Sequence, residues 1–170
     1  SILIFSTIKY HLRFNENKKF MELSNVDLNL AIDASILDKS LKGLKWITPN
    51  YPNNPYKEIE KLIEIKKIIL ADETKKILIS DYQILPAILK LKTVTPNKWF
   101  DDLSVPRPNN KYYENYKDFF TKSLNSQNIE TIYLFKDKER FLTKILEKNC
   151  YNKKLISEIL LKFEIKNCLN

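Results

Sequence analysis

The sequence predicts an α/β fold, a three-layer and Rossmann-like domain with a mostly parallel sheet, and three observations point to it. Segments rich in β-branched and aromatic residues alternate with segments whose apolar residues recur every three or four positions. Parallel neighbouring strands need crossover connections, and this alternation supplies them. A chain of 170 residues with 44% hydrophobic and 29% charged residues is long enough to bury the core of one such domain.

The first elements are predicted from a helical stripe, a short strand and a second helix. Residues 33–42 carry the stripe, which stops at Gly43, the only glycine, and we expect this glycine in the left-handed conformation that ends helices. Residues 44–48 (LKWIT) predict a strand. Asn54 then suits a helix cap and Pro55 a first helical residue, and a broad apolar stripe follows them.

The later elements complete the alternation of strands and helices. They are a strand at 76–80 (KILIS), a short helix at 85–91, a very short strand at 93–95, a helix with an aromatic stripe from Tyr112 to Leu124, a strand at 129–135, a helix capped by Asp137, and a strand at 159–165. The last strand alternates apolar and charged residues, as a half-exposed strand does, and it can run antiparallel at the edge of the sheet. We expect residues 44–170 to form the α/β domain and residues 1–43 a lead-in that packs against it.

Polar and aromatic side chains follow several of the predicted strands, where ligands of open α/β sheets bind. These candidate ligand-binding residues are Asn50, Asp81, Tyr82, Gln83, Asn97 and Trp99. Amides and a carboxylate suit the hydroxyl groups of a sugar, and an aromatic face suits a pyranose ring, so the set has the composition of a glycan-binding cleft. Turn chemistry at strand ends is the other interpretation. The neighbouring Asp101 and Asp102 are adjacent, make a poor acid–base pair, and are expected in a solvated loop.

Several enzyme classes are excluded by residue types that the chain lacks or misplaces. A single glycine excludes the dinucleotide fingerprint and the P-loop, because both need glycines that let backbone amides approach phosphate. The one histidine, His11, lies in the lead-in, and neither cysteine sits at the carboxyl end of a predicted strand, so no hydrolytic triad or zinc site is expected. The sequence therefore predicts no catalytic residue, no metal site and no cofactor in these residues.

The net charge of +8 suggests a polyanion partner, since bound cations release counterions from phosphate. The cations are mostly lysines interspersed with acidic residues, and arginine occurs only at positions 13, 107 and 140. Arginine is the residue preferred for bidentate contacts to phosphate and guanine. The scarcity of arginine counts against such a partner. Because of the net charge, a stand-alone cytosolic α/β module that binds nucleic acid or a nucleotide is kept as the alternative hypothesis. A stand-alone enzyme that uses Asp81 as acid or base is a third.

Five segments together resemble one family of membrane enzymes. They are IKYHLRFNENKKFMELSNVDL (8–28), LKGLKWITPNYPNNPYKEI (41–59), ILISDYQILPAI (77–88), PNKWFDDLSVPRPNNKYYENYKDFF (96–120) and IETIYLF (129–135). They resemble the C-terminal soluble part of bacterial polytopic membrane glycosyltransferases related to the dolichyl-phosphate-mannose protein mannosyltransferases, which use lipid-linked sugars.

The resemblance implies a periplasmic accessory domain, tethered to its own transmembrane region at the inner membrane. Such a domain would position a glycan acceptor or cover the membrane active site. The family's catalytic carboxylate lies in a loop outside these residues, so no catalytic residue is carried over. The apolar run after Ser1 fits the end of a membrane helix as well as a first element of the fold. Cys150 and Cys168 are compatible with a disulfide or with two buried thiols, and a periplasmic location would permit the disulfide.

Overall fold

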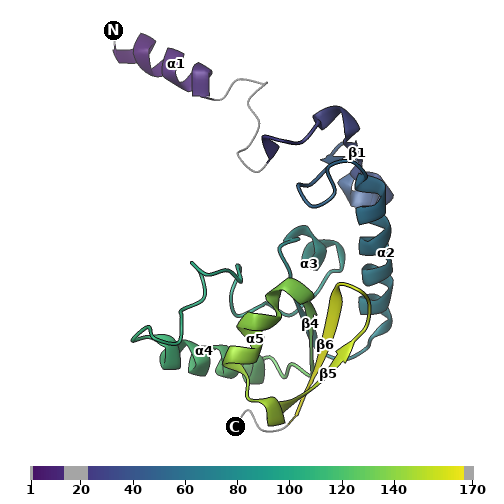
Figure 1. Ribbon diagram of the computed structural model, residues 1–170, viewed down its shortest axis with the longest axis vertical. Helices are drawn as coiled ribbons and strands as arrows, with labels where there is room; N and C mark the ends of the chain where they lie inside the picture. Colours follow the sequence, from purple (N-terminus) through teal and green to yellow (C-terminus); the bar gives the residue numbers. More distant parts are fainter. Residues whose placement is uncertain (1, 14–22, 167–170) are drawn as a thin grey trace. The chain divides into compact units, whose positions relative to one another are not determined.

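The computed structural model describes residues 2–13 and 23–166 and divides the chain into two units, Ser1–Leu62 and Ile63–Asn170 (Figure 1). Helix α2 (Pro55–Ala71) begins in the first unit and ends in the second. Its start follows the prediction, because Pro55 is the first helical residue and the side-chain oxygen of Asn54 accepts a hydrogen bond from the Lys57 amide at 3.1 Å. The two units are described separately.

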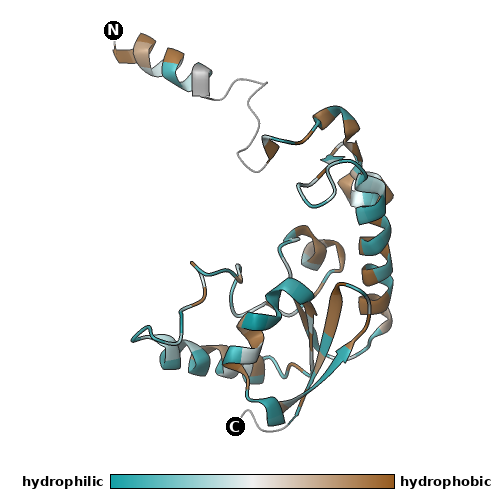
Figure 2. Cartoon of the chain, in the orientation of Figure 1, coloured by the Kyte–Doolittle hydropathy of each residue, from teal (hydrophilic) through white to brown (hydrophobic). Residues whose placement is uncertain are grey.

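The first unit contains helix α1 and a small sheet. Helix α1 (Ile2–Arg13) carries hydrophobic side chains through its first turns (Figure 2). The sheet consists of β1 (Ile32–Asp33) and β2 (Lys45–Trp46), which pair antiparallel with Ile32 opposite Trp46. Three 3₁₀ helices complete the described part of this unit: η2 (Leu28–Leu30), η3 (Ala34–Ile36) and η4 (Lys39–Leu41).

Two predictions for this unit are wrong. Residues 33–42 form separate 3₁₀ helices and no α-helical stripe, because Asp33 and Asp38 each accept the amide hydrogen bond of the serine two residues later, at 2.8 and 2.9 Å. Such side-chain contacts compete with a continuous helix. The strand predicted at 44–48 belongs to the small sheet and not to the main one. Gly43 does adopt a positive φ of 89°, as expected after a helical turn.

The second unit is built around a mixed four-stranded sheet, so the fold is α/β. The strands are β3 (Lys76–Ile79), β4 (Thr131–Phe135), β5 (Tyr151–Leu155) and β6 (Leu160–Ile165). Their order is β3-β4-β6-β5, with β3 and β4 parallel and the other two pairs antiparallel. The last strand is antiparallel, as the sequence allowed, but it lies between β4 and β5 and not at the edge. The three-layer Rossmann-like arrangement stays a prediction.

Helices α4 (Tyr113–Ser126) and α5 (Glu139–Ile145) pack against one face of this sheet (Figure 1). Alternate residues of the strands supply the apolar surface, and the cluster includes Ile77, Ile79, Ile132, Leu134, Leu161, Phe163, Phe120, Leu124, Phe141, Leu142 and Ile145. Burying each such side chain contributes roughly 1.5–3 kcal/mol. The aromatic stripe predicted for α4 thus faces the core at Phe120, although Tyr112 and Phe119 are exposed.

The opposite face of the sheet carries a charged network. Asp72 Oδ2 accepts hydrogen bonds from the Tyr133 hydroxyl at 2.6 Å and from Lys162 Nζ at 2.8 Å. Its Oδ1 accepts from the Thr74 amide at 2.9 Å and the Thr74 hydroxyl at 2.6 Å. Burial alone would raise the pKa of Asp72, but Lys162, Thr74 and Tyr133 outweigh it and hold this pKa well below its usual range. The network ties the chain after α2 to β4 and β6.

The segment predicted as a strand at 93–95 is irregular. The side-chain amide of Gln127 donates to the Val94 carbonyl at 2.8 Å and accepts from the Val94 amide at 2.8 Å. The side chain of Gln127, the residue that follows α4, therefore makes the hydrogen bonds that a neighbouring strand would make. Helix α3 (Ile84–Ile88) agrees with the short helix that the sequence predicts before it.

Candidate functional site

The carboxyl ends of β3 and β4 lie next to each other because these strands pair in parallel, with Ile79 opposite Leu134. The polypeptide that follows each end supplies polar side chains, as open α/β sheets do at ligand sites. We call this group the strand-end site and define it as Asp81, Tyr82, Gln83, Asn97, Lys98, Trp99, Asp137 and Lys138.

A buried lysine is central to the strand-end site. Lys138 Nζ lies 2.7 Å from Asp81 Oδ2 and 3.2 Å from Asp137 Oδ2, and both carboxylate side chains are 61% exposed. Lys138 itself is 9% exposed. Burial alone would lower its pKa, but the hydrogen bonds to Asp81 and Asp137 outweigh it, so the pKa is raised. The ammonium thus holds two carboxylates at the surface, where their remaining lone pairs can accept hydrogen bonds from hydroxyl groups.

The sequence did not predict Lys138, and it assigned Asp137 a different role. Asp137 was predicted to cap α5, but the N-cap residue of this helix is Lys138, and no side chain makes a capping hydrogen bond there. The Asp137 carboxylate instead pairs with the Lys138 ammonium. The 3₁₀ helix η5 (Lys136–Lys138) separates β4 from α5, and Lys138 at its end reaches Asp81. A lysine beside an aspartate directly after a buried strand is the signal that could have found this residue.

Gln83 attaches the loop of residues 97–99 to the end of β3. Its side-chain amide donates to the carbonyl of Ser80 at 2.9 Å and to the carbonyl of Lys98 at 2.9 Å. Asn97 holds the same loop from within, because its amide donates to the carbonyls of Trp99 at 2.7 Å and Ser104 at 3.3 Å. Both side-chain amides therefore donate hydrogen bonds to backbone carbonyls, as amides do in turns, and hold the loop in position.

The two aromatic candidates differ in their surroundings. The Tyr82 ring is half-buried against Phe135, with ring centroids 5.2 Å apart. Trp99 is 45% exposed, and Lys98 Nζ lies 5.6 Å from the centroid of its ring. Since the indole is partly open to solvent, it can contact a ligand at the surface.

The hydroxyl of Tyr116 lies beneath this loop. Among the side chains that the structure describes, its oxygen is buried without a hydrogen bond of normal geometry. Burial raises the pKa of Tyr116 to about 12, and the side chain of Asn97 offsets part of that effect. The loop and α4 are thus in contact through Asn97 and Tyr116.

Asp101 and Asp102 have separate partners. Asp101 Oδ1 accepts from the amides of Leu103 at 3.0 Å and Ser104 at 2.7 Å, and hydrogen bonds from Ser104 lower its pKa, with a smaller effect from Lys138. Asp102 forms an ion pair with Arg140 at 2.8 Å. Both carboxylates are exposed, and neither faces the other as an acid–base pair would.

Three candidates do not follow a strand of the main sheet as predicted. Asn97 and Trp99 come after residues 93–95, which are irregular and form no strand. The third is Asn50. It follows β2, which belongs to the two-stranded sheet, and it lies in the unit of residues Ser1–Leu62. The prediction that Asn50 follows a strand of the main sheet is therefore wrong. The other five candidates lie in the unit that contains the four-stranded sheet.

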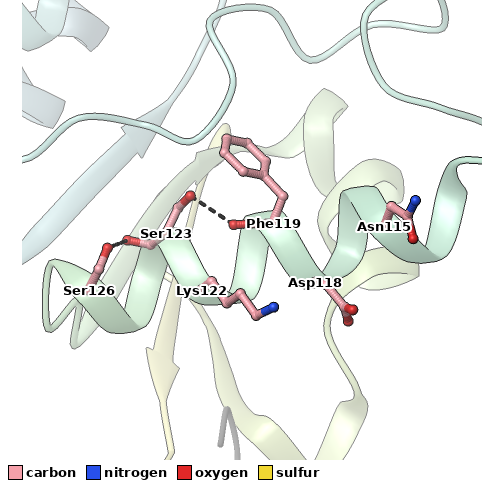
Figure 3. A pocket seen from close by; sticks show the side chains of 6 residues that line it. All are labelled: Asn115, Asp118, Phe119, Lys122, Ser123 and Ser126. Atoms are coloured by element: carbon pink, nitrogen blue, oxygen red, sulfur yellow. Dashed lines mark hydrogen bonds between the residues drawn. The ribbon is translucent and has the colours of Figure 1, made fainter.

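A shallow hollow of about 490 Å³ lies on the exposed side of α4 (Figure 3). Its lining comes from this helix alone: Asn115, Asp118, Phe119, Lys122, Ser123 and Ser126. The serine hydroxyls donate to carbonyls of their own helix, Ser123 to Phe119 at 2.8 Å and Ser126 to Ser123 at 3.1 Å. No second element converges on the hollow, so it is a weaker candidate than the strand-end site.

Within residues 2–13 and 23–166, no three histidine, cysteine, aspartate or glutamate side chains gather as a metal site would need. No helix in the same ranges is both long and apolar enough to cross a membrane. Cys150 is buried, but Cys168 lies outside the described residues, so their disulfide stays a prediction.

Comparison of the chain with protein-family models, with curated proteins and with solved structures finds no match.

Proposed function

We propose that the chain is the extracytoplasmic accessory domain of an integral-membrane glycosyltransferase that uses a lipid-linked sugar donor. In this proposal the strand-end site contacts the glycan, positions the acceptor or covers the membrane active site, and does not catalyse the transfer itself. The proposal accounts for the resemblance of the five segments.

The observation that carries the proposal is an exposed indole and two exposed carboxylates on chain segments that are joined by the hydrogen bond from Gln83 to the Lys98 carbonyl. Trp99 is 45% exposed, while Lys138 holds Asp81 and Asp137 with much of each side chain in solvent. Carboxylates accept hydrogen bonds from sugar hydroxyls, and the indole face packs against the apolar face of a pyranose. Gln83 and Asn97 fix the loop, which lowers the entropy lost when a ligand binds.

Helix α1 supports the membrane part of the proposal. The helix begins with four exposed apolar residues, Ile2, Leu3, Ile4 and Phe5. Four consecutive residues make about one full helical turn, so their side chains lie on all sides of the helix. A groove in a partner protein covers one side of a helix, whereas lipid can cover every side. These side chains therefore suit hydrocarbon, and the basic Lys9 that follows them suits the level of the lipid headgroups.

Titration of the purified chain with neutral oligomannosides, followed by amide chemical shifts, tests the proposal. We expect shifts around residues 80–83, 97–99 and 137–138, loss of binding in Trp99→Ala and partial retention in Trp99→Phe. Phe119→Ala is the matched control, since Phe119 is another exposed aromatic residue of the same unit. Equal binding by Trp99→Ala and the native chain would remove the site from the proposal.

A separate measurement tests the alternative hypothesis of a polyanion-binding module. That hypothesis predicts strong retention of the chain on heparin at low ionic strength and steep elution with salt. The accessory-domain proposal predicts weak retention, because most lysines are interspersed with acidic residues.

A further inference from the structure

The loop after Trp99 presents an apolar side chain to solvent. Leu103 is 97% exposed, more than any other large apolar residue that the structure describes. Scattered exposed apolar residues are ordinary on protein surfaces. Leu103 differs from them because the backbone that carries it is held in a fixed turn.

Four hydrogen bonds fix this turn. Asp101 Oδ1 accepts from the amides of Leu103 and Ser104, and the Asp101 carbonyl accepts from the Val105 amide at 3.0 Å. The fourth runs from the Asn97 side chain to the Ser104 carbonyl at 3.3 Å. On either side of the turn, Phe100 and Val105 are buried in the main apolar cluster. The loop is thus anchored at both ends and points one leucine outward.

The charges next to Leu103 are already paired within the protein. Asp101 is bound by backbone amides, and Asp102 is paired with Arg140 at 2.8 Å. Trp99 and Lys98 lie on the same loop, with the lysine over the indole ring. Tryptophan and lysine are side chains that favour the boundary between hydrocarbon and water. The loop thus carries one fully exposed leucine together with two residues of the types found at lipid interfaces.

We propose that the loop of residues 97–105 is a second membrane contact, in which Leu103 enters the edge of the hydrocarbon region and Trp99 lies at headgroup level. Lipid is the occupant that fits a lone protruding leucine, because fluid chains close around any shape whereas a protein pocket must be complementary to it. The exposed apolar residues Ile2, Leu3, Ile4 and Phe5 at the start of α1 are an independent reason to expect that this chain meets hydrocarbon. This inference rests on the membrane location in the proposed function.

The test uses the full chain and vesicles of phosphatidylethanolamine and phosphatidylglycerol. Partition is measured by co-sedimentation for the native chain, Leu103→Ser and Leu103→Phe. We expect about tenfold weaker partition for Leu103→Ser, from the transfer free energy of one leucine, and native or tighter partition for Leu103→Phe. Leu155→Ser is the matched control, because Leu155 is an exposed leucine of β5 in the same unit. Unchanged thermal unfolding of each variant shows that folding is intact.

The depth to which the loop enters the membrane is measured by quenching of tryptophan emission with brominated lipids. We expect quenching in the native chain that is lost in Trp99→Phe and reduced in Leu103→Ser. If Leu103→Ser binds vesicles and is quenched like the native chain, the loop does not contact lipid and this inference is overturned. In that case partition through α1 and oligomannoside binding at Trp99 would still be observed, so the proposed function would stand. Loss of oligomannoside binding with intact Leu103-dependent partition would instead refute the proposed function alone.

Discussion

Replacement of Asp72 by asparagine is expected to weaken the larger unit more than any exposed substitution. The carboxylate accepts hydrogen bonds from Tyr133 at 2.6 Å, from Lys162 at 2.8 Å and twice from Thr74. The side chain of Asp72 is 10% exposed and that of Lys162 is 19% exposed, so water replaces little of what is lost. Removing one partner of a buried ion pair costs about 3–5 kcal/mol. We expect the lower end, because asparagine keeps one acceptor oxygen.

Urea unfolding followed by circular dichroism measures this loss. The pair should be tested as a double-mutant cycle with Lys162→Met, because removing both charges leaves no buried ion without a partner. We expect the double variant to be at least about 1 kcal/mol more stable than the sum of the single effects implies. A loss below about 1 kcal/mol for Asp72→Asn, or additive effects, would show that the network is not a coupled buried unit.

The same residue predicts the acid limb of the stability curve. The pKa of Asp72 is lower in the folded chain than its ordinary value of about 3.9, despite its burial, because of Lys162, Thr74 and Tyr133. A carboxyl of this kind stabilises the fold above its unfolded pKa, and that contribution is lost as pH falls toward the folded pKa. We therefore expect native stability to fall below about pH 4, and the fall to be shallower in Asp72→Asn.

Three other predictions concern the smaller unit and the cysteines. Glu58 is 1% exposed and accepts from the Trp46 indole at 2.8 Å, so Glu58→Ala should cost about 2–3 kcal/mol in urea unfolding, and a loss under about 1 kcal/mol would contradict this. Gly43→Ala should cost about 1 kcal/mol from its φ of 89° alone, since nothing lies within 4 Å of an added methyl, and a stabilising effect would contradict it. Denatured protein kept from reductant should show no free thiol if Cys150 and Cys168 are bonded, whereas two reactive thiols would exclude the pair.

The sequence predicts an element correctly where its apolar pattern and the residues at its ends indicate the same structure. Helix α2 has both an asparagine cap and an apolar stripe, and β4 consists of buried residues throughout. Strand β5 was missed because four of its five residues are exposed and two are lysines, as suits an edge strand that avoids further pairing. The pairing of β2 with β1 was missed because two-residue strands carry no periodic signal.

Residues of the candidate site were predictable only where they directly follow a strand that the sequence marks clearly. Asp81, Tyr82 and Gln83 follow β3 as expected, since a buried aliphatic run marks that strand. The contact between Lys138 and Asp81 was not predictable, because the parallel pairing of β3 with β4 brings the two residues together and no local pattern encodes that pairing. Asn50 was grouped with the site by the same reasoning, and failed because its strand belongs to another sheet.

Turn chemistry and ligand binding are not exclusive interpretations of this loop. The amide of Gln83 donates to the Lys98 carbonyl, and that of Asn97 donates to the Trp99 carbonyl, so the hydrogen bonds that satisfy the turn also fix the residue that carries the exposed indole. Phe100 then buries the following position in the core. A tryptophan held on both sides loses little freedom when a ligand or a lipid surface covers it. The structural role of the amides is therefore a physical reason to expect Trp99 to be the contact residue.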